Sequence, residues 1–213
     1  MANLTTLTGP KLVSKIRRAN LWKLFVFGLL LLLGILIVAA AVAFVRNEHE
    51  YLKAILMLAV GVLLCWWSGT ELGKRLKVLV NVRNSRMFRK YGSPEEIASI
   101  IANSAESSLI VNKKVLLTES FIFTPSNPES YIPFESVRLF YRKEHRTNGV
   151  QDGLYITVWD EFGDTYDYPF KMGTRHAVDF EDAMKELSVR CKNTMIGYSA
   201  ANISTVKANK RDI

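Results

Sequence analysis

Cysteine and histidine are scarce in this sequence, which contains two and three of them among 213 residues. Cys65 lies in a hydrophobic run and Cys191 lies far along the chain, so neither a disulfide framework nor a CxxC metal site is available. The histidines have neither HxxxH nor HExxH spacing, which argues against a zinc site. We therefore expect no metal and no cofactor, and the low cysteine content fits a reducing compartment.

Motifs of the common enzyme classes are also missing. The sequence contains no GxxxxGK(S/T), no GxGxxG and no GxSxG pattern. The acids near Asp160 do not form a calcium loop, because Gly163 follows Asp160 by three residues rather than five. Cys191 lies on the inner face of an amphipathic pattern, as a small core residue does. We predict that the chain is not an enzyme.

Acidic residues are nearly absent from the first 90 residues, which hold 14 Lys and Arg but only three Asp and Glu. Residues 91–213 hold 14 and 17, so the two parts carry net charges of +11 and −3. A pI near 9.5 is typical of nucleic-acid-binding proteins. Here, however, the cations flank hydrophobic segments, where they meet anionic lipid head groups. We expect a lipid bilayer as partner, and no nucleic acid.

Charge is missing altogether from residues 24–45 and 54–70. At about 1.5 Å per residue the first run is long enough to cross a hydrocarbon core of about 30 Å, and the second is near the lower limit. With interfacial residues included, we predict membrane spans at about 22–45 and 53–70, forming a helical hairpin over residues 21–70. Gly28, Gly34 and Gly61 allow the two helices to approach closely.

Basic residues flank the ends of the hairpin that lie away from its connection. A basic segment, residues 1–20, precedes the first span, and residues 71–90 follow the second. The positive-inside rule therefore places both termini and the C-terminal domain in the cytoplasm, with the chain as a multi-pass protein of the cell membrane. Alternatively, residues 11–43 resemble a signal peptide with an Ala41-Val42-Ala43 cleavage site, although the apolar run is longer than usual. In that case the second span acts as a stop-transfer segment.

Residues 71–90 are expected to continue the second helix as a basic juxtamembrane helix. Two interpretations stay open: a solvated stalk that packs lightly on the domain, or a helix that lies on an anionic leaflet. Arg138 and Arg142 belong to a basic cluster on an expected strand, and their even spacing puts both on one face if the strand is regular. They either protect a sheet edge from aggregation or bind a head group or an acidic partner. The candidate lipid or partner contacts are Lys74, Arg75, Lys77, Arg83, Arg86, Arg89, Lys90, Arg138 and Arg142.

An α+β domain is predicted over residues 91–198. Ser93 and Glu96 form a capping box at the start of a helix, with Pro94 in its first position. Short strands are expected at 108–111, 115–118 and 121–124, followed by a loop at 125–128. A long strand at 131–145 and two more at 154–159 and 165–170 complete an antiparallel sheet of about five strands. A C-terminal helix at 174–192 covers the sheet, and residues 199–213 are expected to be a mobile tail.

This order of strands and one C-terminal helix resembles a pleckstrin-homology-like (PH-like) domain. More narrowly, the chain resembles uncharacterised two-helix membrane proteins of Gram-positive bacteria. The matching stretches are Tyr91-Gly92-Ser93-Pro94-Glu95-Glu96-Ile97, Leu117-Thr118, Ile132-Pro133-Phe134-Glu135-Ser136-Val137 with Tyr141, and Cys191-Lys192-Asn193 leading to Gly197-Tyr198-Ser199. The resemblance covers essentially the whole chain and implies a PH-like fold and a bacterial cell membrane. It supplies no catalytic or ligand-binding residues.

The function that these observations favour is a membrane-anchored, non-enzymatic interaction or scaffold protein. It would bind a protein partner or associate with itself, for example along an exposed sheet edge. One alternative is a module that senses anionic lipid through its basic residues. Another is an accessory subunit of a membrane enzyme or transporter. Because neither uncharged run, 24–45 or 54–70, contains an ionisable Asp, Glu, Lys, Arg or His, the usual mark of an ion or substrate path is missing.

Overall fold

The structure is a computed structural model that describes residues 7–45, 51–104, 110–112, 115–170 and 174–211. The chain divides into two compact units, one of Met1–Leu12 with Arg86–Ile213 and one of Val13–Ser85. We call the first the α+β unit and the second the hairpin unit. Each is described by itself.

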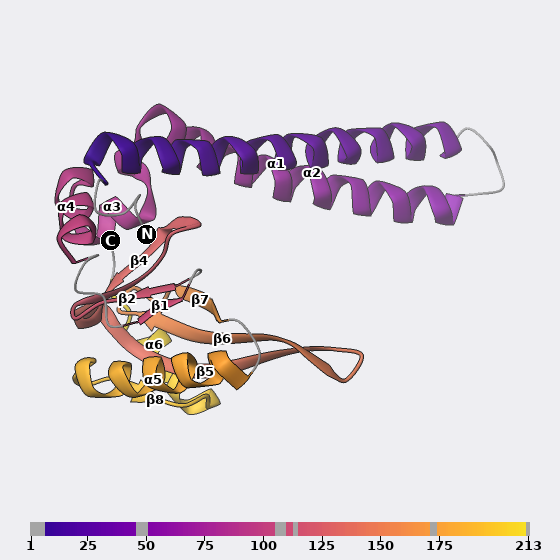
Figure 1. The fold of residues 1–213 in the computed structure, drawn as a ribbon. Helices are drawn as coiled ribbons and strands as arrows, with labels where there is room; N and C mark the ends of the chain where they lie inside the picture. Colours follow the sequence, from indigo (N-terminus) through magenta and orange to yellow (C-terminus); the bar gives the residue numbers. More distant parts are fainter. Residues whose placement is uncertain (1–6, 46–50, 105–109, 113–114, 171–173, 212–213) are drawn as a thin grey trace. The chain divides into compact units, whose positions relative to one another are not determined.

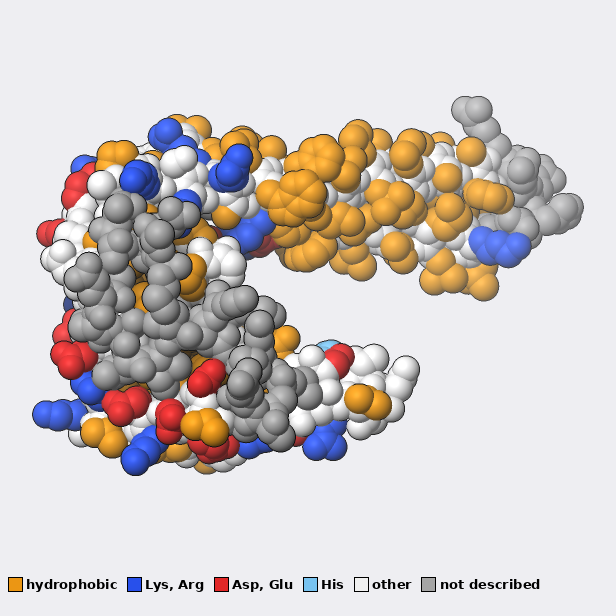
Figure 2. All heavy atoms as spheres, viewed as in Figure 1, with side chains coloured by type: hydrophobic (Ala, Val, Ile, Leu, Met, Phe, Trp, Pro, Cys, Tyr) orange, Lys and Arg blue, Asp and Glu red, His pale blue; other side chains and the backbone are white. Residues whose placement is uncertain are grey.

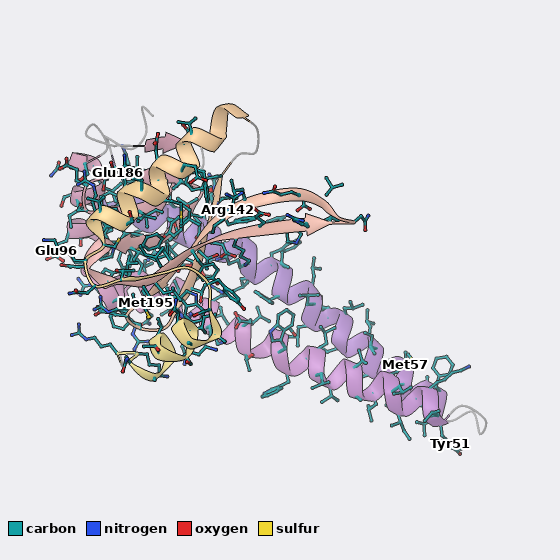
Figure 3. The ribbon with its side chains drawn as sticks, turned by 90° about the horizontal axis from the view of Figure 1, so that it is seen from below. Tyr51, Met57, Glu96, Arg142, Glu186 and Met195 are labelled. Atoms are coloured by element: carbon teal, nitrogen blue, oxygen red, sulfur yellow. The ribbon has the colours of Figure 1, made fainter. Side chains whose placement is uncertain are left out.

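Two long helices, α1 (Gly9–Val45) and α2 (Tyr51–Val80), make up most of the hairpin unit and lie side by side (Figures 1 and 3). Both are long and apolar enough to cross a membrane, and only 11% and 17% of their most hydrophobic windows are buried. Figure 2 shows hydrophobic side chains covering the visible surface of this pair. Leu36, Leu63 and Trp66 are 61–71% exposed. A core helix of a soluble protein buries such residues, whereas a lipid-facing helix presents them outward. The prediction of two apolar helices of spanning length is confirmed.

The two helices lie close together at a pair of glycines. A β-carbon built on Gly34 would lie 2.7 Å from the Cys65 Sγ and 3.3 Å from the carbonyl oxygen of Gly61. A β-carbon on Gly61 would lie 2.8 Å from Val38 Cγ2. A β-carbon built on Gly28 would have no atom of the other helix or of any non-adjacent side chain within 4 Å. Gly34 and Gly61 thus hold the close approach by lacking side chains, and Gly28 does not contribute to it.

The expected continuous helix over residues 71–90 is wrong. α2 ends at Val80, a short 3-10 helix η1 (Val82–Asn84) follows, and α3 (Arg86–Tyr91) belongs to the α+β unit. Asn81 is extended (φ −135°, ψ 106°), and its side chain accepts a hydrogen bond from the Arg83 backbone N–H. The Asn84 amide donates to the Lys77 carbonyl at 3.2 Å. These asparagine side chains offer the backbone hydrogen bonds that compete with helix continuation.

Helix α4 (Pro94–Ser104) begins as predicted from its capping box. The Ser93 N–H donates to Glu96 Oε2 at 2.8 Å, and the Glu96 N–H donates to Ser93 Oγ at 3.3 Å. Hydrogen bonding from the Ser93 backbone N–H, and then from the Ser93 side chain, lowers the pKa of the Glu96 carboxyl. The helix buries Ile97, Ala98 and Ile101 on one face, and its predicted start is confirmed.

Two four-stranded sheets replace the single sheet that the sequence predicts. The first pairs β1 (Ile110–Asn112), β2 (Val115–Leu117), β3 (Phe121–Thr124) and β4 (Asn127–Pro133) antiparallel in chain order. The second has the order β7 (Thr165–Phe170), β6 (Val150–Asp160), β5 (Val137–Thr147) and β8 (Met195–Ile196), with β8 parallel to β5. The coarse α+β class is confirmed, and the sheet arrangement is corrected.

The expected long strand at 131–145 is interrupted by a 3-10 helix, η2 (Phe134–Ser136), between β4 and β5. Pro133 has a φ of −70° and no N–H, so it ends the ladder of β4. The Phe134 N–H then donates to the Ser120 carbonyl. The expected loop at 125–128 is also shorter, because Thr124 pairs with Asn127 across a tight turn. The chain therefore passes from one sheet to the other at Pro133.

The core of the α+β unit lies between the two sheets and α5 (Thr174–Arg190). Phe180, Ala183 and Leu187 of α5 pack with buried side chains from both sheets, as the predicted inner face requires. A second, smaller cluster joins Leu139 of β5 to Val206 of α6 (Ala200–Ala208). The expectation of a mobile tail is therefore wrong for residues 199–211.

The stability of α6 comes from local and tertiary contacts together. The Ser199 side chain accepts a hydrogen bond from the Asn202 N–H at 3.0 Å and caps the helix. Val206 is only 3% exposed, and the Arg211 N–H donates to the Glu161 carbonyl at 2.7 Å. One buried side chain is too sparse a pattern to show as a periodic apolar stripe in the sequence.

Candidate functional site

Lys90 is fully buried, although the sequence made it a candidate lipid contact. Its ammonium group lies 2.5 Å from Asp160 Oδ2 and 2.8 Å from Asp164 Oδ2, and its side chain is 0% exposed. The rings of Tyr91, Phe162 and Tyr166 lie 4.8–5.9 Å from the same nitrogen. No lipid head group can reach it in this position. This corrects the expectation that Lys90 contacts lipid. Its ion pairs instead connect α3 to the turn between β6 and β7.

Burial and neighbouring negative charge shape the tyrosines around this cluster. The Tyr91 hydroxyl donates to Asp160 Oδ2 at 2.8 Å. Desolvation, together with the charge of Asp160, raises the pKa of Tyr91 and of Tyr166 well above the usual value for tyrosine. Desolvation also raises the pKa of Tyr168, whose hydroxyl donates to the Ser130 carbonyl. All three hydroxyls stay protonated at neutral pH. Those of Tyr91 and Tyr168 donate hydrogen bonds within the fold, and that of Tyr166 accepts one from the Lys90 ammonium at 3.5 Å.

The basic residues near the end of α2 differ in their pairing. Lys74 and Arg75 lie 2.6 and 3.4 Å from the carboxylate oxygens of Glu71. The side chains of Lys77 and Arg83 are exposed and have no acidic partner among the residues that the structure describes. Among the candidate contacts in the hairpin unit, Lys77 and Arg83 are therefore the ones that no described acidic residue compensates.

Two further candidates from residues 71–90 belong to the α+β unit. Arg86 is 69% exposed at its side chain and pairs with Asp164 at 3.2 Å. Arg89 is exposed, and no described residue supplies it with an acidic partner. Only some of the basic residues at positions 71–90 therefore carry a charge that no described acidic residue compensates.

Arg138 and Arg142 do not form the uniform basic face that their spacing predicts. The register of β5 shifts between Val137 and Leu139, so Arg138 lies at an irregularity of the strand. Its guanidinium donates to Glu161 Oε2 at 2.8 Å and to the Glu135 carbonyl at 2.7 Å. Arg142 pairs with Glu144 at 2.7 Å. The condition of a regular strand is not met, and each of the two arginines has an acidic partner within the fold.

Beyond its pairing with β8, strand β5 continues with β6 into a two-stranded extension that reaches a free tip (Figures 1 and 3). We call residues 142–153 the β5–β6 arm. Strand β8 pairs with β5 only at Leu139 and Phe140, and β7 pairs with β6 only from Leu154 onward. In the described part of the chain, no strand covers either edge of the arm, and residues 142–150 are exposed.

On the β8 side of the arm, no described residue pairs with the outward-facing backbone groups of β5. The Phe140 carbonyl accepts a hydrogen bond from the Gly197 N–H at 3.0 Å, so it points away from β6. Backbone groups of alternate residues in an antiparallel strand point the same way. The N–H and C=O groups of Arg142 and Glu144 therefore face the open edge. Such an edge is a template for another strand.

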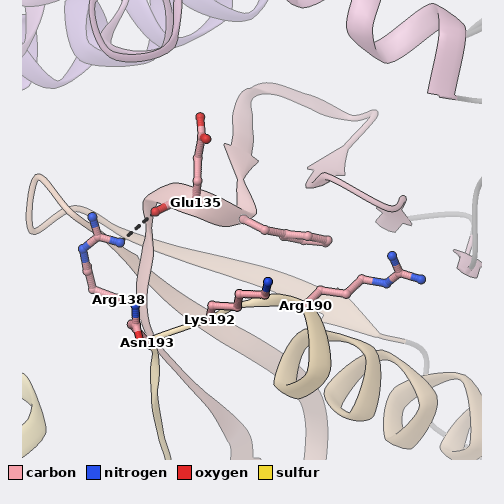
Figure 4. Close-up of a pocket in the computed structure, with 6 residues that line it drawn as sticks. Glu135, Arg138, Arg190, Lys192 and Asn193 are labelled. Carbon is pink, nitrogen blue, oxygen red and sulfur yellow. Dashed lines mark hydrogen bonds between the residues drawn. The ribbon is translucent and has the colours of Figure 1, made fainter.

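A pocket of about 460 Å³ lies where η2, the start of β5 and the end of α5 meet (Figure 4). Its lining includes three basic side chains, Arg138, Arg190 and Lys192. The other lining residues are Phe134, Glu135 and Asn193. Sequence reasoning missed this pocket, because Arg138 lies 52 positions before Arg190 and only folding brings it near Arg190 and Lys192.

The described residues contain no group of three His, Cys, Asp and Glu side chains that could hold a metal ion. Burial raises the pKa of the Cys191 thiol to about 12, so this thiol stays protonated at neutral pH. His145 lies on the exposed arm with its Nδ1 2.6 Å from Asp152. His49 and the side chain of His176 lie outside the described residues.

Comparisons with protein-family models, with curated proteins and with solved structures found no match to this chain.

Proposed function

We propose that this protein is a membrane-anchored, non-enzymatic interaction protein, whose β5–β6 arm binds an extended segment of a partner protein as an added strand. The observation that carries the proposal is the open edge at Arg142 and Glu144, on an exposed arm that no described strand covers. Backbone hydrogen bonds along such an edge give affinity, and alternate side chains give specificity.

The membrane part of the proposal rests on the hairpin unit. α1 and α2 have spanning length and expose their apolar side chains. The excess of cations before the first span and after the second supports a topology with both termini and the α+β unit in the cytoplasm of a bacterial cell. The proposed role of the hairpin is to keep the arm at the membrane surface, where its partner would be another membrane or membrane-associated protein.

The order of elements in the α+β unit supports the proposed kinship to PH-like domains. Four antiparallel strands are followed by three, β5 to β7, and then by α5. PH-like domains, as the resemblance describes them, share strands followed by one capping helix. The added strand β8 and helix α6 extend this order in the present chain.

A proline at the open edge tests the arm. Glu144→Pro removes one N–H from the open edge, whereas the ladder bonds to β6 come from the neighbouring residues. Glu144→Ala is the matched control, since it removes the same ion pairs with Arg142 and Arg146 but keeps the N–H. Full-length, tagged chains are isolated from the native membrane after crosslinking, and bound proteins are quantified by mass spectrometry.

We expect wild type and E144A to retain the same partner and E144P to lose it. Circular dichroism of all three purified chains checks that the fold is kept. A partner set that is identical for the three chains would rule out strand addition at this edge. A partner lost equally from E144A and E144P would instead assign the contact to the Glu144 side chain.

The second candidate function, sensing of anionic lipid, is favoured by the exposed cations Lys77 and Arg83. In nanodiscs, anionic lipid should then raise the melting temperature of the full chain more at low salt than at high salt, because exposed charges are screened. Lys77→Gln with Arg83→Gln should reduce this difference. This function would be excluded if the melting temperature depended neither on the charge of the lipid nor on the salt concentration.

A further inference from the structure

We propose that the pocket between η2, β5 and the end of α5 binds a phosphate group of a small ligand, through Arg190 and Lys192, with Arg138 beside them. This site is separate from the β5–β6 arm and from the exposed cations of the hairpin unit. The proposal does not depend on the proposed function, since it concerns different residues and a different class of ligand.

The guanidinium of Arg190 is held in place while its terminal nitrogens stay available. Its Nε donates to Glu186 Oε2 at 2.8 Å, one turn earlier on α5, and the side chain is 29% exposed. Among the described residues, no group accepts from its two Nη atoms. A guanidinium fixed at Nε presents these two nitrogens as a fork, which matches two oxygens of a phosphate. Fixing the side chain beforehand lowers the entropy that binding must remove.

Lys192 supplies a second donor group to the same pocket. It follows α5 directly, its side chain is exposed, and it has no acidic partner in the described part of the chain. In Figure 4 its side chain lies between those of Arg138 and Arg190, whose guanidinium groups extend to opposite sides, and the Glu135 side chain points away from all three. The acid that lines the pocket therefore does not compete for the Lys192 ammonium.

Arg138 adds positive charge at the other side of the pocket. Its Nη1 donates to the Glu135 carbonyl and its Nη2 to Glu161 Oε2, which fix the guanidinium plane. Glu161 also lies 3.7 Å from Arg211 and accepts from the Ser136 hydroxyl at 3.4 Å. Because Glu161 is shared among these donors, it compensates Arg138 only in part. The pocket thus keeps net positive character.

These features favour a phosphate over a carboxylate. A carboxylate has two oxygens and one charge, which the Arg190 fork alone satisfies. A phosphomonoester has three terminal oxygens and close to two charges at neutral pH, so it engages both the fork and the Lys192 ammonium. The volume of about 460 Å³ exceeds what a phosphate fills, and leaves room for the polar body of the ligand.

Titration of the full chain in phosphatidylcholine nanodiscs tests this inference, with glycerol 3-phosphate as the soluble probe and calorimetry as the readout. Wild type should bind saturably with one site. Arg190→Gln and Lys192→Gln should each weaken binding roughly tenfold or more, which is the loss expected for one hydrogen bond to a charged group. Lys185→Gln is the matched control, because it removes the same charge from an exposed position of α5 outside the pocket.

A second arm distinguishes a lipid phosphate from a soluble one. Nanodiscs that contain phosphatidic acid carry the same phosphomonoester on a lipid. If the lipid occupies the pocket, glycerol 3-phosphate should no longer titrate in these discs, and R190Q should abolish the effect of the lipid. If the soluble ligand alone fits, the titration should be unchanged by phosphatidic acid.

The inference is overturned if neither probe binds saturably, or if K185Q weakens binding as much as R190Q does. Melting temperatures without ligand show whether each variant folds. Should R190Q be unstable, Arg190→Lys keeps the charge but lacks the fork, and it should still bind at least severalfold more weakly than wild type. Equal binding by R190K and wild type would likewise show that the two Nη atoms of Arg190 do not bind the phosphate as a fork.

Discussion

Asp160 satisfies four donors with one carboxylate. Its Oδ1 accepts from the N–H groups of Phe162 and Asp164, at 3.0 and 2.9 Å. Its Oδ2 accepts from the Lys90 ammonium and the Tyr91 hydroxyl. Burying two opposite charges is costly, but leaving one of them without its partner costs more. At the residue scale, this carboxylate therefore links the shape of the β6–β7 turn to the position of α3.

Replacing Asp160 by Ala should destabilise the α+β unit by about 3–5 kcal/mol, since it leaves a buried ammonium with an incomplete set of acceptors. Breaking the exposed pair between Arg86 and Asp164 by Arg86→Ala should cost at most about 1 kcal/mol. Chemical unfolding of the full chains in detergent, followed by circular dichroism, measures both. Equal effects of D160A and R86A would contradict the structural role of Asp160.

The Cys191 thiol should resist alkylation. Its pKa of about 12, against an ordinary 9.0, reduces the thiolate fraction at pH 8 by roughly 1,000-fold. Ser188→Cys places a second thiol at an exposed position of the same helix as an internal reference. Iodoacetamide treatment and peptide mass spectrometry should find residue 188 modified and residue 191 unmodified until the protein unfolds. Modification of both at similar rates would show that Cys191 is accessible.

At the scale of elements, α1 and α2 can lie close together because two residues between them are glycines without side chains. Gly34 and Gly61 bring the two backbones together beside Cys65 and Val38. In a bilayer, lipid tails are as apolar as leucine side chains, so helix association depends on such close packing rather than on the hydrophobic effect. A larger side chain at this position must push the helices apart.

Gly34→Leu should therefore lower the stability of the hairpin unit by about 1–3 kcal/mol, the usual cost of overpacking. Gly28→Leu introduces the same side chain where nothing lies within 4 Å, and should have little effect. Melting of the full chain in detergent, monitored by far-ultraviolet circular dichroism, compares the two. Should both glycines tolerate leucine equally well, the Gly34–Gly61 contact would not stabilise the hairpin.

For the whole molecule, charge and apolar surface are distributed in a way that a membrane explains. The two helices expose apolar residues over most of their length. The α+β unit instead buries its apolar residues in a core between two sheets and α5. Water and lipid select opposite surfaces, so one chain with both kinds fits a protein that is anchored in a membrane and folded in water.

Opposite accessibility of the start of α2 and of α6 would establish the proposed topology. A cysteine introduced by Tyr51→Cys should react with an impermeant maleimide in intact cells, because it lies at the hairpin connection. A cysteine introduced by Lys207→Cys, in α6, should react only after the cells are permeabilised. The unmodified chain corrects for Cys65 and Cys191. Labelling of K207C in intact cells would reverse the orientation.

Much of the local structure was predictable because it depends on neighbouring residues. The capping box at Ser93 and the inner face of α5 around Phe180 follow from spacing alone, and both are confirmed. The division of residues 131–145 between two sheets was not predictable, because strand-forming residues run through Pro133 on both sides. Helix α6 depends on Val206 meeting Leu139, which is a contact across more than 60 residues.

The features of the candidate site likewise fall into those that the sequence predicts and those that only the tertiary structure creates. The two apolar helices follow from the uncharged runs of the sequence alone, because the length and composition of a spanning helix are local properties. Which cations are accessible was decided only by the tertiary structure, since a charge is compensated by whatever folding places within a few ångströms. Lys90 and Lys77 look alike in the sequence, yet one is buried against Asp160 and the other is exposed. The open edge of the arm and the basic pocket likewise exist only once strands and helix ends have met.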